Sequence, residues 1–100
     1  MATTSKALAR AAAATTSTTL YTVPSATTTV VTNIVVTNSA ASAATFTITL
    51  DGVDLFKTVS LAANTTAAFD LKQVLATTKI IAGFASATTV NFHISGVEIA

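Results

Sequence analysis

Cysteine and tryptophan are absent from this chain of 100 residues, and histidine and methionine occur once each. Only 9% of the residues carry a charge. Without cysteine there is neither a disulfide framework nor a thiolate site for a metal. The side chains that catalyse reactions, hold metals or bind phosphate groups are therefore scarce. We expect no enzyme activity, no catalytic residue, no cofactor and no metal site.

Strong net charge and long apolar runs are also missing. The formal net charge is +1, which gives little attraction to nucleic acid or to an anionic membrane. No apolar run approaches the roughly 18 residues that span a bilayer. We therefore expect no nucleic-acid partner, no membrane and no small-molecule substrate. A surface with so few charges gives a free monomer little protection against association. We therefore expect neighbouring proteins to cover part of the surface.

Threonine and alanine are abundant instead, with 22 and 21 copies. The large apolar residues lie between Leu20 and Ile99, in short segments dense in the β-branched residues that favour strands. Turn residues separate these segments at intervals of about 8–12 residues. The sequence predicts an antiparallel β-sandwich, jelly-roll or immunoglobulin-like. Its roughly seven strands are expected at 20–23, 28–37, 45–50, 53–61, 66–71, 79–86 and 90–99.

The clearest local signal is a hairpin around Asp51-Gly52. Apolar and threonine residues alternate strictly through Thr45–Leu50, as in a half-buried strand. An Asp-Gly pair then favours a two-residue turn, because both positions accept a positive φ. Two further irregularities are expected, a helical turn over Leu71–Ala76 and a β-bulge at Gly96, where the apolar phase of the last strand changes.

The segment Thr28–Thr37 is apolar on both faces. Strict alternation would place Val30, Ile34 and Val36 on one face and Val31 and Val35 on the other. Such a strand is either central between two layers or covered on its outer face by another subunit.

Residues 1–18 have a different composition, with Lys6 and Arg10 but no acid. Three interpretations remain open: an organelle transit peptide, a disordered tail, and an arm that becomes ordered on a partner. Residues 6–14 contain good helix formers behind a possible cap at Ser5, but they are too few for an isolated helix to persist. We divide the chain into an extended N-terminal arm, 1–18, and a sandwich domain, 19–100.

Few polar residues suggest chemistry. His93 is expected on the face opposite Phe92 and Ile94, as a surface or interface residue. The pair Asp51 and Asp54 falls short of the six to eight oxygens that calcium prefers. Residues 64–66 match the acceptor motif for N-glycosylation, and we interpret this segment only as a turn.

Three segments together resemble small virion structural proteins of tailed bacteriophages, cyanophages among them. They are LYTVP from Leu20, VVTNIVVTNSAASAATFTI from Val30 and VNFHISGVEI from Val90, behind the SKAL start at Ser5. The resemblance covers about four-fifths of the chain. It implies a β-sandwich module that decorates and cements a capsid, or that forms part of a tail or fibre.

The resemblance leads to two expectations about function. The first is a capsid decoration (cement) protein, a homotrimer on the outer surface of the virion that bridges copies of the major capsid protein. The second is a tail-fibre or baseplate module that adheres to a host-surface glycan. The residues expected to contact a partner are Lys6, Leu8, Arg10, Val31, Val35 and His93.

Overall fold

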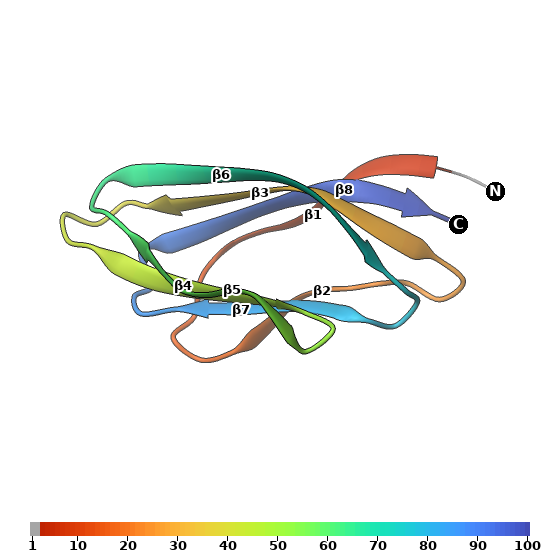
Figure 1. Ribbon diagram of the computed structural model, residues 1–100, viewed down its shortest axis with the longest axis horizontal. Coiled ribbons are helices and arrows are strands. Elements are labelled where there is room, and N and C mark those ends of the chain that lie inside the picture. The colour runs from red at the N-terminus through yellow and green to blue at the C-terminus, as the bar shows by residue number, and fades with distance from the viewer. Residues whose placement is uncertain (1–2) are drawn as a thin grey trace.

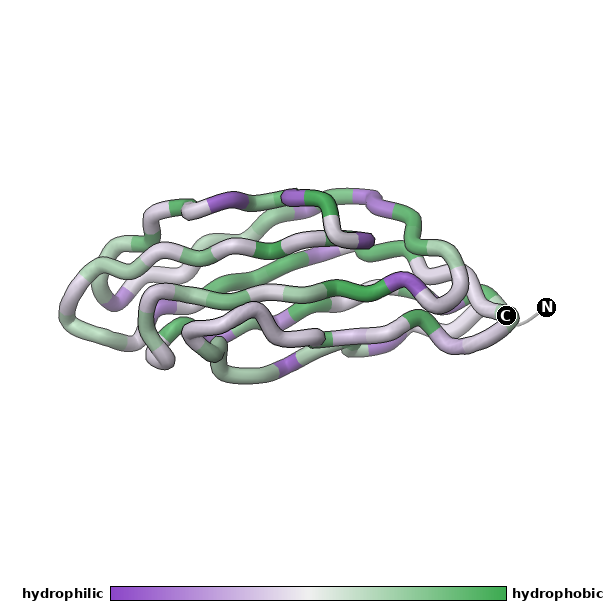
Figure 2. The backbone as a smooth tube through the Cα atoms, turned by 90° about the horizontal axis from the view of Figure 1, so that it is seen from below, coloured by the Kyte–Doolittle hydropathy of each residue, from purple (hydrophilic) through white to green (hydrophobic). Residues whose placement is uncertain are grey.

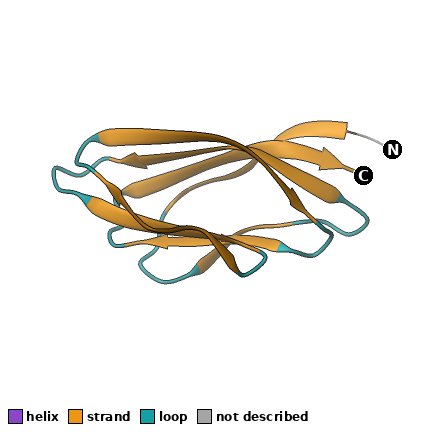
Figure 3. Ribbon diagram, in the orientation of Figure 1, coloured by secondary structure: helices purple, strands orange, loops and turns teal. Residues whose placement is uncertain are grey.

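The computed structural model describes residues 3–100, and this part of the chain is built from strands without a helix (Figures 1 and 3). None of the described residues belongs to a helix long and apolar enough to cross a bilayer. The eight strands are β1 (Thr3–Ala12), β2 (Thr18–Thr22), β3 (Thr28–Asn38), β4 (Ala44–Leu50), β5 (Val53–Leu61), β6 (Thr65–Leu75), β7 (Ile80–Ala85) and β8 (Val90–Ile99).

The strands form two antiparallel sheets of four that pack face to face (Figure 1). The first sheet has the order β1-β8-β3-β6, and the second has the order β2-β7-β4-β5. Only β4 and β5 are joined by a hairpin within one sheet, and every other connection passes from one sheet to the other. This order is that of an eight-stranded jelly roll. The predicted antiparallel sandwich is confirmed, and the topology selects the first of the two expected types.

The core lies between the inner faces of the two sheets. The apolar side chains that alternate with polar ones along the strands fill this space. Figure 2 shows hydrophobic and hydrophilic segments following one another closely along the strands. Phe46 contacts three other rings, with centroid distances of 5.9 Å to Phe56, 6.3 Å to Phe69 and 6.2 Å to Phe92. These rings come from four strands and both sheets, so they hold the two layers together. The largest fully buried apolar side chains are Phe46, Phe92, Ile34, Ile48, Ile81 and Ile94.

The hairpin predicted at Asp51-Gly52 is confirmed. Asp51 has φ 54° and Gly52 has φ 75°. The two residues join β4 to β5, with Leu50 opposite Val53. Two positive φ values in a two-residue loop match the right-handed twist of the flanking strands.

A β-bulge in β3 changes which valines face the core. Val31 pairs with Gly96 and Asn33 pairs with Ser95, so β3 uses one residue more than β8 between these pairs. The extra residue, Thr32, shifts the alternation. As a result Val31 is fully buried with Ile34 and Val36, whereas Val30 faces outward. The assignment of Val30 and Val31 from strict alternation is therefore wrong.

The expected N-terminal arm is also wrong for the described residues. Thr3–Ala12 forms β1 and pairs with β8 along its length. Leu8 is 7% exposed and belongs to the core. Pairing with β8 and burial of Leu8 outweigh the helix preference of this alanine-rich segment, which is too short to persist as an isolated helix. The sandwich therefore begins with β1 rather than at residue 19, and it has eight strands rather than about seven.

Two smaller predictions are wrong for the same kind of reason. β6 continues as a strand to Leu75, so no helical turn occupies Leu71–Ala76. β8 keeps a regular alternation through Gly96, and the bulges lie in its neighbours β3 and β1. Val97 therefore faces outward, which explains the change of apolar phase without any irregularity in β8.

Candidate binding surface

The acidic groups and the one histidine of the described residues lie apart from one another. No group of three or more His, Asp or Glu side chains among residues 3–100 is placed to hold a metal ion. His93 lies on the outer face of the first sheet, half-buried, between Arg10 on β1 and Val35 on β3. The outer face of the first sheet is therefore the candidate for binding a partner.

The outer face of the first sheet carries two rows of side chains that run across the strands. One row contains Arg10, His93, Val35 and Ala68, and the other contains Ser5, Val97, Val30 and Val74. Laterally paired residues on one face of a sheet lie close enough for their side chains to touch. The second row thus places three valines side by side on β8, β3 and β6. We call Val97, Val30 and Val74 the valine row.

The valine row is open to solvent at one end. Val74 is 69% exposed, while Val30 and Val97 are half-buried. Exposed valines scattered singly are normal, but three adjacent ones on a face with few charges form a small apolar patch. None of these three residues was among the expected contacts. The outward phase of Val97 after Gly96 was the available signal, and it was misread as a bulge.

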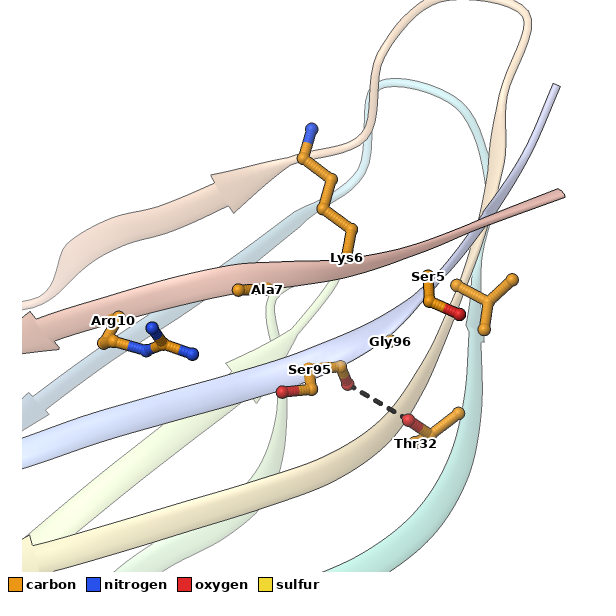
Figure 4. Close-up of a pocket in the computed structure, with 8 residues that line it drawn as sticks. Ser5, Lys6, Ala7, Arg10, Thr32, Ser95 and Gly96 are labelled. Atoms are coloured by element: carbon orange, nitrogen blue, oxygen red, sulfur yellow. Dashed lines mark hydrogen bonds between the residues drawn. The ribbon is translucent and has the colours of Figure 1, made fainter. Parts of the chain in front are cut away.

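Beside the valine row lies a shallow pocket on β1, β8 and β3 (Figure 4). Ser5, Arg10, Ser95 and Thr32 line it, and the Thr32 hydroxyl donates to the Ser95 carbonyl oxygen at 3.4 Å. Lys6 extends away from these residues, past the edge of β1 (Figure 4). The pocket is open and combines polar and apolar groups, so it adds hydrogen-bonding groups to the face without enclosing a ligand.

The structure brings together only part of the expected contact set. Arg10, Val35 and His93 share one row of the outer face. Lys6 is exposed at the edge. Leu8 and Val31 lie in the core, 7% and 0% exposed, and are therefore not available to a partner. Leu8 was misplaced with the arm, and Val31 was misplaced by the bulge at Thr32.

A hydrogen-bonded chain closes one end of the sandwich. The Tyr21 hydroxyl on β2 donates to the Glu98 carboxylate on β8 and lies 2.8 Å from the Thr29 hydroxyl on β3. Since the carboxylate can only accept, the Thr29 hydroxyl donates to Tyr21. Lys6 on β1 approaches the same carboxylate at 3.4 Å. The chain joins one strand of the second sheet to three of the first.

These contacts shift two pKa values in opposite directions. Burial raises the pKa of Tyr21, and the hydrogen bond to Glu98 raises it further. The hydrogen bond from Tyr21 holds the pKa of Glu98 below its ordinary value, with a smaller contribution from the positive charge of Lys6. Both shifts favour a neutral tyrosine donating to an ionised carboxylate.

The lowered pKa of Glu98 predicts a loss of stability in acid. Its contribution is complete above the pKa of the unfolded chain and disappears as the pH falls through the lower pKa of the folded state. Glu98→Gln keeps an acceptor for Tyr21 but cannot titrate. We expect the free energy of unfolding of this variant to fall less steeply than that of the parent protein between about pH 5 and pH 3. Urea unfolding at a series of pH values measures both slopes.

Asp54→Asn is the matched control for this measurement. Asp54 is half-exposed in the β4–β5 hairpin region and its carboxylate lies 3.7 Å from the Lys57 amine. The control variant is expected to keep the parental slope, because exposed ion pairs contribute little. Equal slopes for the parent and Glu98→Gln would contradict the role given to Glu98.

Comparison with known proteins adds a weak structural likeness. No protein-family model matches the chain, and no curated protein matches it. Among solved structures, a chain from "Structure of infectious bursal disease virus Gx strain" is 15% identical with a TM-score of 0.46. The match covers 97% of the present chain but only 30% of that chain's length. At this TM-score neither a common fold nor a common function follows.

Proposed function

We propose that this protein is a decoration (cement) protein of a tailed bacteriophage. In this role it lies on the outer surface of the head, bridges neighbouring copies of the major capsid protein and performs no catalysis. The observation that carries the proposal is the outer face of the first sheet, where adjacent strands present valines with little charge between them. The resemblance of the strand sequences to phage virion structural proteins supports the same role.

The composition of this face suits adhesion to a large protein surface. Besides the valine row it presents threonine, serine, asparagine and alanine side chains, with Arg10, Asp70 and Lys72 on the two outer strands. Neutral side chains lose little free energy on dehydration compared with buried ionised groups. A partner can therefore cover the face at low cost, and the charges at its margins favour one orientation.

The body of the protein, rather than an arm, provides the bridge in this proposal. β1 is part of the first sheet, so residues 3–12 are not free to extend over a neighbour. The sandwich itself measures 46 × 21 × 17 Å. A rigid module of this length can contact more than one capsid subunit through its long face. The homotrimer expected from the sequence stays a prediction.

The glycan-binding alternative finds less support in the side chains. Sugar sites commonly use an aromatic ring as a platform. Tyr21 is 9% exposed and its hydroxyl is engaged inside the sandwich. The five phenylalanines, all among the described residues, are buried or half-buried. No exposed ring is therefore offered by residues 3–100.

Copy number and attachment test the proposed function together. We expect purified virions to contain the protein in a copy number comparable to that of the major capsid protein. We expect Val35→Glu to lower its binding to capsids that lack it by at least about tenfold, because binding would then require dehydration of a carboxylate. Quantitative mass spectrometry measures the first quantity and co-sedimentation measures the second.

Ser60→Glu is the control for attachment. It adds the same charge at an exposed position on β5, in the other sheet, and is expected to bind like the parent protein. Far-ultraviolet circular dichroism checks that both variants are folded. A copy number limited to the few symmetric positions of a tail would favour the fibre alternative, and unchanged binding of Val35→Glu would remove the outer face from the contact.

A further inference from the structure

The four edge strands of the sandwich differ in how well they are protected against pairing. β2 has only 5 residues. β5 is interrupted by register shifts and by Thr58, which has φ 49°. β1 has a bulge at Leu8 and presents two cations, Lys6 and Arg10. Short length, bulges and charges of one sign are the usual devices that prevent edge pairing.

β6 has fewer of these protections. It is 11 residues long and has one register shift, where Leu71 and Lys72 both lie opposite Thr32 of β3. No residue of β6 has a positive φ. Ala68, Asp70, Lys72 and Val74 are exposed on its outward side. The strand therefore presents a long row of unpaired backbone groups at the edge of the first sheet, with a single register shift at Leu71 and Lys72.

The charges on β6 are also without partners in the described structure. Three of the four carboxylates lie near a lysine, in the pairs Lys6–Glu98, Lys57–Asp54 and Lys79–Asp51. Asp70 and Lys72 form no ion pair with any of residues 3–100. Asp70 only accepts a hydrogen bond from the Asn33 amide, at 3.2 Å. One acid and one base thus stand two positions apart on the same side of a free edge.

We infer that β6 pairs antiparallel with β6 of a second copy of this chain, about a twofold axis that passes beside Leu71. A twofold axis perpendicular to the sheet leaves the outer faces of the two copies on the same side. Opposed residues must then point to the same face, so the residue beside the axis lies opposite its own copy. An axis at Asp70 or at Lys72 would place like charges directly opposite each other. The axis at Leu71 instead places Asp70 opposite Lys72 of the partner subunit. The twofold symmetry produces two such acid–base pairs.

The same register also joins the apolar surfaces of the two copies. Val74 lies opposite Ala68 of the partner subunit. Within each subunit, Val74 lies at the end of the row that contains Val97 and Val30, and Ala68 lies next to Val35 on the neighbouring strand. The valine row of one copy thus continues into the row of Ala68, Val35, His93 and Arg10 of the other copy, across a single sheet of eight strands. Cross-strand apolar and opposite-charge pairs both stabilise such a joint.

Charge reversal with rescue tests the pairing on the isolated protein. We expect the parent protein to sediment as a dimer that dissociates on dilution. Lys72→Asp and Asp70→Lys each place like charges in both symmetric pairs and should raise the dimer Kd at least about tenfold. The double variant D70K/K72D restores opposite charges and should restore the parental Kd. Lys57→Asp, an equal charge change on β5, is the control and should leave Kd unchanged.

A cysteine placed on the axis gives a second measurement. The parent chain has no cysteine, so any crosslink comes from the introduced residue. Opposed Cα atoms in an antiparallel pair are about 4.5–5.5 Å apart, within disulfide range. Leu71→Cys should therefore form a disulfide-linked dimer on mild oxidation, whereas Gln73→Cys, displaced from its own copy by four positions along the strand, should not.

Several results would overturn the inference. The twofold dimer is an alternative to the homotrimer expected from the sequence, so a trimer at all concentrations would contradict it, as would a monomer. A dimer that is indifferent to the two charge reversals would also contradict it. If the parent protein is monomeric and Lys72→Asp weakens attachment to capsids, β6 serves a capsid strand instead of a second copy. Because the dimer is measured without capsids, its failure leaves the attachment test of Val35→Glu unaffected.

Discussion

Phe46→Ala is expected to lower the free energy of unfolding by about 3–5 kcal/mol, the usual cost of removing a buried ring. Phe46 is 1% exposed and lies at the centre of the aromatic cluster, where it contacts three other rings. Its loss leaves a cavity between the two sheets that rigid strands cannot close. For a domain of this size the melting temperature should fall by at least about 12 °C. Thermal unfolding followed by circular dichroism measures the change.

Phe84→Ala is the matched control for the cavity. Phe84 lies on β7 next to Thr47 on β4, but it is half-buried and does not belong to the core cluster. The same truncation there removes less buried surface, so its cost should be clearly smaller than that of Phe46→Ala. Similar losses for the two variants would mean that the aromatic cluster does not hold the sheets together.

The second large effect is expected at Gly96, where an added Cβ atom has no room beside the neighbouring strand β3. A Cβ atom at this position would lie 2.3 Å from the Val30 carbonyl oxygen and 2.9 Å from the Leu8 Cδ1 atom. The Leu8 side chain can turn away, but the carbonyl belongs to the neighbouring strand of the sheet. Gly96→Ala should therefore cost about 3 kcal/mol, at the upper end for overpacking. Urea unfolding measures the loss.

The control for Gly96 is the turn glycine. Gly52 has no heavy atom within 4 Å of an added Cβ, and its cost comes from φ 75° alone. Gly52→Ala should lose only about 1–2 kcal/mol. Adding Leu8→Ala to Gly96→Ala should not restore stability, because the carbonyl of Val30 remains in place. A larger loss for Gly52→Ala than for Gly96→Ala would contradict the steric explanation.

The local patterns of the sequence predicted most strands but not their faces. Alternation in Thr45–Leu50 and the Asp51-Gly52 turn were sufficient for the hairpin, because both depend on neighbouring residues. β1 was missed, since an alanine-rich segment becomes a strand only when β8 offers an edge. The inner and outer sides of β3 were exchanged at Val30 and Val31, because one extra residue reverses the alternation and leaves no mark in composition.

The candidate surface was predicted in part. Arg10, Val35 and His93 reach the outer face, and their types and alternation placed them on a surface beforehand. Val74 was missed because its segment was interpreted as a helical turn. Its neighbours Val30 and Val97 become part of one row only through the strand order of the first sheet.

The sequence by itself determined the all-β class, the hairpin and the scarcity of reactive side chains, because composition and the period of two act over a few residues. The tertiary structure decided the strand order, the bulge that turns Val30 outward and the open edge at β6. These features depend on pairing between segments as distant as β1 and β8, and such pairing depends on how the whole set of strands is packed.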